Sequence, residues 1–350
     1  MNVLCVLPWY PANAPVFLAE AFARVGCHVT RIGPKYFDHM GLEWPEAELP
    51  KVDMELPREG SIWNLDAMVD MATYAGYPPD LLYVSEENYR TEIIPTSKVP
   101  VILWSQDGWP DNYARKALFQ PTVAYCNQPR GNRYHPLDED VESWKFMPGA
   151  AAPWIHADER LERTHDFCLY GTMYGQRTKI VEGLTRRGFK VLHGQRTTEH
   201  YVMGLNRSLC TYHNSGWHEV KWRFFEAAAM GCLNISSHTP LLDRLGYKPY
   251  EHYFPVDAPP DAGGDPWPSV VDVVSILKEL RLKRLFLHSV TSRAREHTLR
   301  HHMYYHRILR IAKDLDMKEL GDMAQRSIEK TLAENKLKWQ SPLDLKGEDS

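Results

Sequence analysis

The sequence predicts an α/β protein with two Rossmann-like, doubly wound domains that face each other across a cleft, followed by C-terminal helices. Strand and helix signals alternate along both halves of the chain, and a segment rich in proline, glycine and alanine, Pro148–Arg163, separates the halves. The 350 residues, 43% hydrophobic and 25% charged, suffice for two ordinary globular domains.

Short apolar or alternating segments in the N-terminal half have the length and composition of buried strands. They cover residues 3–7, 28–32, 80–84, 100–104, 118–126 and 144–147. Between them, Pro15–Gly26 has apolar residues at helical spacing and ends at a glycine, and Asn64–Ala75 has one apolar face. We therefore expect a first domain over residues 1–150 and a linker over 151–163.

The C-terminal half repeats the same alternation. Strand signals cover residues 166–170, 189–193, 208–213, 232–236 and 253–256, and helix signals cover 179–187, 199–206, 220–230 and 241–245. Two long helices are predicted over 270–315 and a third over 317–336, before a polar tail. We expect a second domain over 164–315 and a C-terminal helix and tail over 316–350. In such a plan ligands bind at the carboxyl ends of the strands, in the cleft between the domains.

Charge, cysteine content and hydropathy exclude several classes of protein. The net charge of −4 gives no overall attraction for nucleic acid or an anionic membrane. No apolar run approaches the roughly 20 residues of a membrane span, and the N-terminus lacks a secretory pattern, so we expect a cytoplasmic protein. The six cysteines form no Cys-x-x-Cys pair and are expected to be buried, reduced thiols.

Arg223 and Glu226 have the chemistry of a nucleotide-binding pair. A guanidinium near the start of a helix can hold a diphosphate together with the free N–H groups of the helix terminus. Glu226 lies three residues later, on nearly the same helical face, and its carboxylate can accept ribose hydroxyls. The alternative is an ordinary amphipathic helix with a surface Arg–Glu pair.

Five further candidate residues follow two of the predicted strands in the C-terminal half. Gly171-Thr172 would let the backbone approach a phosphate, and Arg177 would add a second cation; the alternative is a loop glycine and an arginine at a helix N-terminus. His213 and Asn214 follow another strand and are candidates for contacts with a donor sugar or phosphate.

The region 140–312 resembles the CgeB-like glycosyltransferases, which have the GT-B fold. The resemblance rests on Arg-x-x-Glu before a helix of small residues and on four further segments. These segments are WKFMPGAAAP (144–153), DFCLYGTMYGQR (166–177), FKVLHG (189–194) and SRAREHTLRHHMYYHRILR (292–310), the last with His297-Thr298 before Tyr305-His306-Arg307. The resemblance implies hexosyl or pentosyl transfer from a nucleotide diphosphate sugar, bound by the second domain, to an acceptor hydroxyl at the first. No other cofactor is implied.

One position departs from the pattern of related enzymes. Many retaining GT-B enzymes carry Glu-x7-Glu, whose first carboxylate lies near the donor sugar. Counting back from Glu226 places His218 there, with Glu219 one position nearer. The acid that contacts the sugar, and the choice between inversion and retention, therefore stay open.

The N-terminal half offers candidates for acceptor binding and for the base. Trp9 and Asn13 lie in the loop after the first predicted strand. This loop either forms a wall of the acceptor site or is a rigid turn packed on its own domain. Trp109 follows a later strand and is a third candidate for acceptor binding. The family often has an aromatic-x-x-Asp here, and Trp104 and Asp107 have this spacing. Asp107 is our candidate for the base that takes the acceptor proton; a cap before Pro110 is the alternative. The competing carboxylates are Glu86 and Glu87.

The spacing of four histidines resembles that of a metal site but is not sufficient evidence for one. His297/His301 and His302/His306 are spaced i,i+4, but no acid-bearing zinc motif accompanies them. The segment Lys278–Arg310 carries nine Lys and Arg against two acids, which favours solvated or phosphate-facing histidines. GT-B enzymes generally neutralise the leaving diphosphate with side chains and a helix terminus, so we expect no metal.

Several functions remain open from the sequence. The acceptor is a glycan, a protein or a hydroxymethylated base in phage DNA, which would be modified in an infected bacterial host. A non-catalytic nucleotide- or sugar-binding protein and a two-Rossmann sugar epimerase are the alternatives on the same fold.

Overall fold

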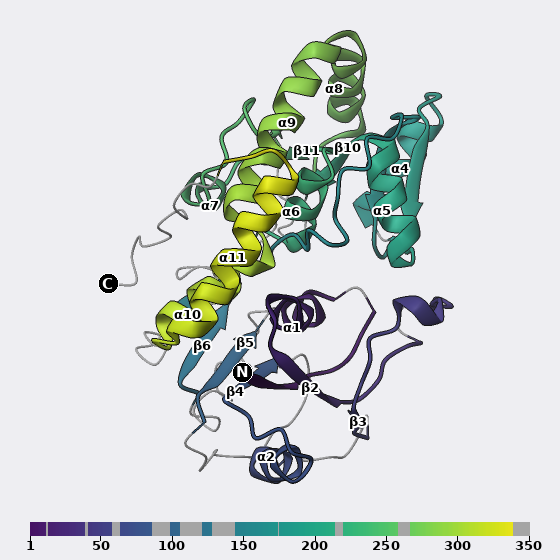
Figure 1. Ribbon diagram of the computed structural model, residues 1–350. Helices are drawn as coiled ribbons and strands as arrows, with labels where there is room; N and C mark the ends of the chain where they lie inside the picture. Colours follow the sequence, from purple (N-terminus) through teal and green to yellow (C-terminus); the bar gives the residue numbers. More distant parts are fainter. Residues whose placement is uncertain are drawn as a thin grey trace. The chain divides into compact units, whose positions relative to one another are not determined.

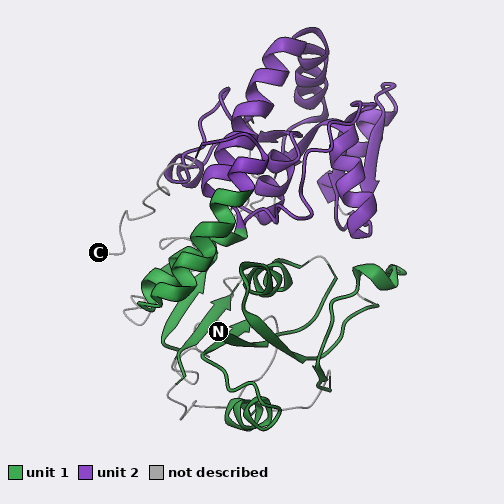
Figure 2. Ribbon diagram, viewed as in Figure 1, with its two compact units in different colours: residues 1–148, 304–330, 349–350 green, residues 149–303, 331–348 purple. Residues whose placement is uncertain are grey.

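The computed structural model describes residues 1–11, 13–38, 41–57, 64–85, 99–105, 121–127, 144–173, 175–213, 220–257 and 267–338. These residues form two compact units (Figure 2). Unit 1 comprises Met1–Pro148 and Tyr304–Lys330, and unit 2 comprises Gly149–Met303 and the segment from Thr331. Each unit is built on a parallel sheet, as the sequence predicted.

Unit 1 has a seven-stranded sheet with the order β3-β2-β1-β4-β5-β6-β7. The strands are β1 (Asn2–Val6), β2 (His28–Gly33), β3 (Met54–Glu55), β4 (Leu81–Ser85), β5 (Val101–Ser105), β6 (Val123–Cys126) and β7 (Trp144–Phe146). All neighbours pair in parallel. Every residue of β4 and β5 is buried, because the sheet is covered on both faces.

Helices α1 (Ala14–Val25) and α2 (Leu65–Tyr74) cover opposite faces of this sheet (Figure 1). The alternation of side chains along β4 shows the same division. Leu82 belongs to the cluster that includes the apolar face of α2, whereas the ring of Tyr83 packs against Phe22 of α1. A short 3₁₀ helix, η2 (Glu46–Glu48), precedes β3.

Helix α10 (Tyr304–Asp314) and much of α11 (Lys318–Glu334) group with unit 1. The sequence predicts a second domain that extends to residue 315, whereas the contacts of α10 group it with unit 1. The ring of Tyr304 packs near Phe17 of α1 and Trp104 of β5, and Arg307 Nε donates to the Pro148 carbonyl at 2.9 Å. The unit to which α10 belongs is therefore set by its tertiary packing. The helical pattern of its sequence does not show this packing.

Unit 2 has a five-stranded sheet with the order β12-β11-β10-β8-β9. The strands are β8 (His165–Tyr170), β9 (Val191–Gly194), β10 (Ser208–His213), β11 (Leu233–Ser236) and β12 (Phe254–Pro255). The helices are α4 (Gly175–Thr185), α5 (Thr198–Arg207), α6 (Trp222–Ala229), α7 (Pro240–Arg244), α8 (Val270–Leu282) and α9 (Arg284–His301). All five strands are parallel.

The two faces of this second sheet carry separate cores. Alternate residues of β8, such as Phe167 and Leu169, belong to a cluster with α4, α8 and α9. Cys168 and Tyr170 point the other way, into a cluster with α5 and α6. A sheet sandwiched in this manner leaves its strand ends as the places where polar groups gather.

All six cysteines are buried and none forms a disulfide, as expected. Among the helices of the described ranges, none combines the length and the hydropathy that crossing a membrane requires.

Candidate functional site

The order of strands in unit 2 reverses between β8 and β10. Chain connections leave in opposite directions from such a point and open a crevice at the carboxyl ends of the two strands. β8 ends at Tyr170 and is followed by Gly171, whose φ is +116°. β10 ends at His213, which the parallel register places level with Tyr170. The residues predicted after these two strands therefore meet at one place.

Two guanidinium groups converge on Gly171. A Cβ atom at this position would lie 2.8 Å from Arg177 Nη1 and 2.9 Å from Arg223 Nη1. Arg223 Nη1 donates to the Tyr170 carbonyl at 2.7 Å, and Arg177 Nη1 donates to the Thr172 carbonyl at 3.1 Å. Both guanidinium groups can approach the backbone here because the residue is a glycine and has no side chain.

Other side chains support this arrangement. Gln195 Nε2 donates to the Thr172 hydroxyl at 3.1 Å, and the Gly171 N–H donates to the Gly194 carbonyl at 3.0 Å, which ties the end of β8 to the end of β9. The guanidinium of Arg177 lies 5.7 Å from the ring centroid of Trp267. Trp267 is buried, so Arg177 rests on a fixed surface.

Glu226 is buried, with only 2% of its surface exposed. Tyr201 of α5 donates its hydroxyl proton to Oε2 at 2.6 Å, and His156 Nε2 lies 3.4 Å from Oε1. The surface Arg–Glu pair, our alternative for this helix, is therefore wrong: α6 is buried from Phe224 to Ala229. The sequence did not single out His156 or Tyr201, because only the fold brings them to Glu226.

Burial moves the pKa values of this cluster toward neutral forms. It lowers the pKa of His156 to about 3 and raises that of Glu226 to about 7, the latter despite opposing contributions from Tyr201 and Arg223. His156 Nδ1 accepts the Ala152 N–H at 3.0 Å, so the neutral ring carries its proton on Nε2, toward Glu226. The contact is a hydrogen bond between a neutral histidine and a carboxyl group rather than an ion pair.

His213 is buried and packs edge-on against the ring of Phe224, with centroids 5.1 Å apart. It therefore joins α6 to the carboxyl end of β10, beside the arginine pair. Asn214, the neighbouring candidate, lies outside the described residues, as do His218 and Glu219.

The candidates in the N-terminal half have different outcomes. Trp9 is completely buried, so its side chain cannot form an acceptor wall here, and the alternative of a turn packed on its own domain is correct. Asn13 is half-buried at the N-cap of α1, and its role stays a prediction. Trp104 is in the core and donates its indole N–H to the Met147 carbonyl at 3.3 Å. The remaining candidates lie outside the described residues: Glu86, Glu87, Asp107 and Trp109.

The expectation of solvated histidines is also corrected. His302 and His306 are buried, and His297 Nε2 and His302 Nε2 both lie within 2.9 Å of the Leu245 carbonyl. The ring of Tyr247 stacks on His302. Across the described ranges, no group of three or more His, Cys, Asp or Glu side chains is placed to hold a metal ion.

Comparison with known proteins gives a match that contains this site. Residues 153–313 match the model of a family described as glycosyl transferase-like. No curated protein matches the chain in sequence. Arg177 and Arg223 both lie within the matched residues.

Two solved structures are similar over nearly their whole length. Sucrose-phosphate synthase from Thermosynechococcus elongatus has 14% identity and a TM-score of 0.54, with 93% of this chain and 100% of that chain covered. The catalytic domain of starch synthase IV from Arabidopsis thaliana, bound to ADP and acarbose, has 9% identity and a TM-score of 0.51, with coverages of 94% and 99%. The fold is thus that of GT-B glycosyltransferases. The matched family agrees with it, whereas the CgeB-like subfamily stays a prediction.

Proposed function

We propose that this protein is a glycosyltransferase that binds a nucleotide diphosphate sugar in unit 2 and transfers the sugar to an acceptor hydroxyl. The observation that carries the proposal is the convergence of Arg177 and Arg223 on Gly171, at the strand-order reversal of the sheet. Two guanidinium groups can each present a fork of N–H donors to phosphate oxygens, which suits a diphosphate.

The start of α6 strengthens the same anion site. Trp222 and Arg223 are its first residues, so unpaired backbone N–H groups and the positive end of the helix dipole lie beside the Arg223 side chain. Because Gly171 has no side chain, both guanidinium groups lie against the backbone here, where they can meet one diphosphate together. Arg177, Arg223 and this helix terminus would then carry the charge of the leaving diphosphate, which is why the proposal requires no metal.

Glu226 is proposed to accept a ribose hydroxyl of the donor. Tyr201 and His156 each use one acceptor position of the carboxyl group, and each carboxylate oxygen has a second lone pair. A pKa of about 7 means that Glu226 changes protonation near neutral pH, so its acceptor strength increases through that range. Tyr201 and His156 act as positioning residues that hold the carboxyl group.

Transfer needs an acceptor hydroxyl and a base. The acceptor oxygen forms a bond to the anomeric carbon of the donor, the bond from that carbon to the diphosphate oxygen breaks, and the hydroxyl proton passes to a carboxylate. Asp107 is proposed for that carboxylate, with Glu86 and Glu87 as alternatives. The acceptor is proposed to be a glycan, a protein or a hydroxymethylated base; the net charge of −4 disfavours the last.

The test is a thermal-shift screen with a panel of nucleotide sugars, since a ligand that binds only the folded state raises the melting temperature. At least one donor is expected to raise the melting temperature of the wild type. Arg223→Ala should abolish this increase, and Arg223→Lys, which keeps the charge but loses the fork, should reduce it. Arg186→Ala, which changes an exposed arginine directly after α4, is the matched control and should retain the full increase.

The melting temperature of each variant without ligand shows whether a lost shift reflects weaker binding or a less stable fold. If Arg223→Ala melts near the wild-type temperature yet gives no shift, the arginine acts on the ligand. A donor shift that is the same in Arg223→Ala as in the wild type would remove Arg223 from the site and, with it, the main support for this function.

A further inference from the structure

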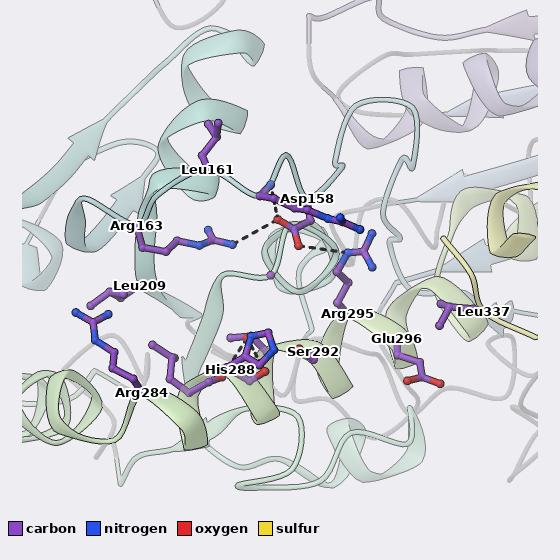
Figure 3. A pocket seen from close by; sticks show the side chains of 14 residues that line it. Asp158, Leu161, Arg163, Leu209, Arg284, His288, Ser292, Arg295, Glu296 and Leu337 are labelled. Atoms are coloured by element: carbon purple, nitrogen blue, oxygen red, sulfur yellow. Dashed lines mark hydrogen bonds and ion pairs between the residues drawn. The ribbon is translucent and has the colours of Figure 1, made fainter. Parts of the chain in front are cut away.

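A pocket in unit 2 is lined by residues at the amino ends of three strands, since Arg163 precedes β8, Leu209 lies near the start of β10 and Gly231 precedes β11 (Figure 3). The arginine pair lies at the opposite, carboxyl ends of the strands. The volume of the pocket is about 520 Å³. Arg163, which precedes β8, locates it: the guanidinium donates to the carbonyls of Leu205 at 2.6 Å and Met230 at 2.8 Å, at the ends of α5 and α6. This pocket is therefore distinct from the proposed donor site.

The two walls of the pocket come from different parts of the chain. One wall is the segment Asp158–Arg163, and the other is the face of α9 that carries Arg284, His288 and Arg295. Gly231 contributes to the lining, where a Cβ atom would lie 3.1 Å from Arg163 Nη2. The volume falls in the range of small-molecule sites, roughly 300–1,000 Å³.

Positive charge dominates the lining. Four arginines face two acids, and one of these acids, Glu296, pairs with Arg300 at 2.6 Å. The other, Asp158, lies between Arg163 and Arg295, which reach it from two sides at 3.8 and 3.9 Å (Figure 3). Both distances are long for an ion pair, so a single carboxylate partly neutralises two cations.

The remaining two arginines, Arg160 and Arg284, are exposed. Within the part of the chain that the structure describes, neither guanidinium has a hydrogen bond or an ion pair. Burial lowers the pKa of Arg295, which indicates that its charge is incompletely solvated. The pocket thus has an excess of cations that no carboxylate of the described residues balances.

We propose that this pocket binds a small phosphorylated molecule that lacks a nucleobase, with Arg160 and Arg295 holding the phosphoryl group and Arg284, eleven residues before Arg295 on α9, contacting the other end of the ligand. Guanidinium groups match the geometry of phosphate oxygens. Apart from the imidazole of His288, no aromatic ring lines the pocket in the described residues, so a nucleobase would have no surface to stack on. A ligand here is an effector, because the pocket and the arginine pair lie at opposite ends of the strands.

The experiment is isothermal titration of the full chain with inorganic diphosphate and, separately, with glucose 6-phosphate. The first probe tests the bare anion and the second tests a sugar phosphate. The double charge reversal Arg160→Glu/Arg284→Glu is expected to weaken binding by more than about tenfold, because it replaces one exposed cation at the proposed phosphoryl position and one at the other end of the pocket with carboxylates that repel an anion. Arg293→Glu, on the same helix but outside the pocket, is the matched control.

A second variant keeps the two anion sites apart. Arg223→Ala should leave the pocket's binding of the phosphorylated probe intact, since Arg223 lies at the other end of the strands. The inference is overturned if neither probe binds the wild type. It is also overturned if binding survives Arg160→Glu/Arg284→Glu and is lost in Arg223→Ala, which would place all phosphate binding at the donor site.

Discussion

The two units have sheets of the same design but different chemistry where the strand order reverses. In unit 2, the backbone leaves β8 at Gly171, and two guanidinium groups occupy the space that a side chain would take. In unit 1, the order reverses between β1 and β4, and the chain leaves β1 through Leu7 to Trp9, which are both buried. The same topology therefore offers an anion site in one unit and an apolar turn in the other.

The residues directly after the strands therefore decide function, whereas the strands provide only the position. The two units are therefore proposed to have different roles in binding. Unit 2 is proposed to bind the charged donor, and unit 1 has no comparable pair of cations among its described residues at the corresponding strand ends.

Removal of both cations from unit 2 is expected to have the largest effect. Arg177→Ala/Arg223→Ala should raise the donor KM, or lower kcat/KM for the donor, by about 100-fold or more, because two charge-assisted contacts to phosphate are lost. Asn13→Ala in unit 1 should change the acceptor KM and leave the donor KM unchanged. Steady-state kinetics in which donor and acceptor are varied separately gives both KM values for each variant. Equal effects of the two variants on the donor KM would contradict the asymmetry.

Substitution of one glycine in each unit should distinguish an effect on donor binding from an effect on stability. Gly171→Ala should weaken donor binding by about tenfold or more, because the new methyl group meets two guanidinium groups that must move away. At Gly33 in unit 1, a Cβ atom would lie 1.9 Å from the Leu7 carbonyl oxygen, which is backbone and cannot move easily. Gly33→Ala should therefore cost about 3 kcal/mol of stability or more.

Chemical denaturation and donor titration of both glycine variants check this division. Gly33→Ala molecules that do fold should bind the donor with wild-type affinity. If Gly171→Ala binds the donor normally, the positions of the two guanidinium groups beside Gly171 do not matter for donor binding.

Acidification is expected to weaken unit 2 before unit 1. Burial lowers the pKa of His252 and of His301 in unit 2 to about 4 each, against an ordinary value of 6.5. Because the folded pKa values lie below the unfolded one, their contribution to stability is complete above pH 6.5 and is lost as the pH falls from 6.5 toward 4. The loss should be on the order of 1–2 kcal/mol in total, a figure reduced because both rings are partly solvated.

Hydrogen exchange followed by mass spectrometry at pH 7 and pH 5, corrected for intrinsic exchange rates, resolves the two units. Amides of β10 and β11 should lose protection relative to those of β1 and β4. His301→Gln should reduce this difference. Uniform loss of protection in both units would show that these histidines do not control acid stability.

The smallest expected effect concerns Glu226. Its folded pKa of about 7 lies above the ordinary 4.5, so the folded state prefers the protonated form and loses stability as the pH rises from 4.5 to 7. Glu226→Gln should therefore be more stable than the wild type at pH 8 by on the order of 1 kcal/mol, with the difference vanishing near pH 4.5. Urea denaturation at the two pH values tests the sign, and a variant that is less stable at pH 8 would contradict it.

Local sequence patterns were sufficient for much of the fold. The predicted strands 166–170 and 208–213 correspond to β8 and β10, because strands buried on both faces appear as continuous apolar runs. The helical spacing of Arg223 and Glu226 also placed both on α6. These features depend only on neighbours along the chain.

Features that depend on distant contacts could not be predicted in this way. Tyr201 and His156 reach Glu226 from other elements, and nothing in their local sequence shows this. Trp9 follows a strand, as an acceptor-binding residue would, yet its ring is buried by packing within unit 1. The same holds for α10, whose apolar face does not specify which unit it covers.

The central claim is that Arg177 and Arg223 hold the diphosphate of a sugar nucleotide beside Gly171. The most direct measurement is a crystal structure of the protein with the donor that gives the largest thermal shift. We predict phosphate oxygens within hydrogen-bonding distance of both guanidinium groups. A diphosphate bound elsewhere, including the pocket formed by Asp158–Arg163 and α9, would contradict the claim.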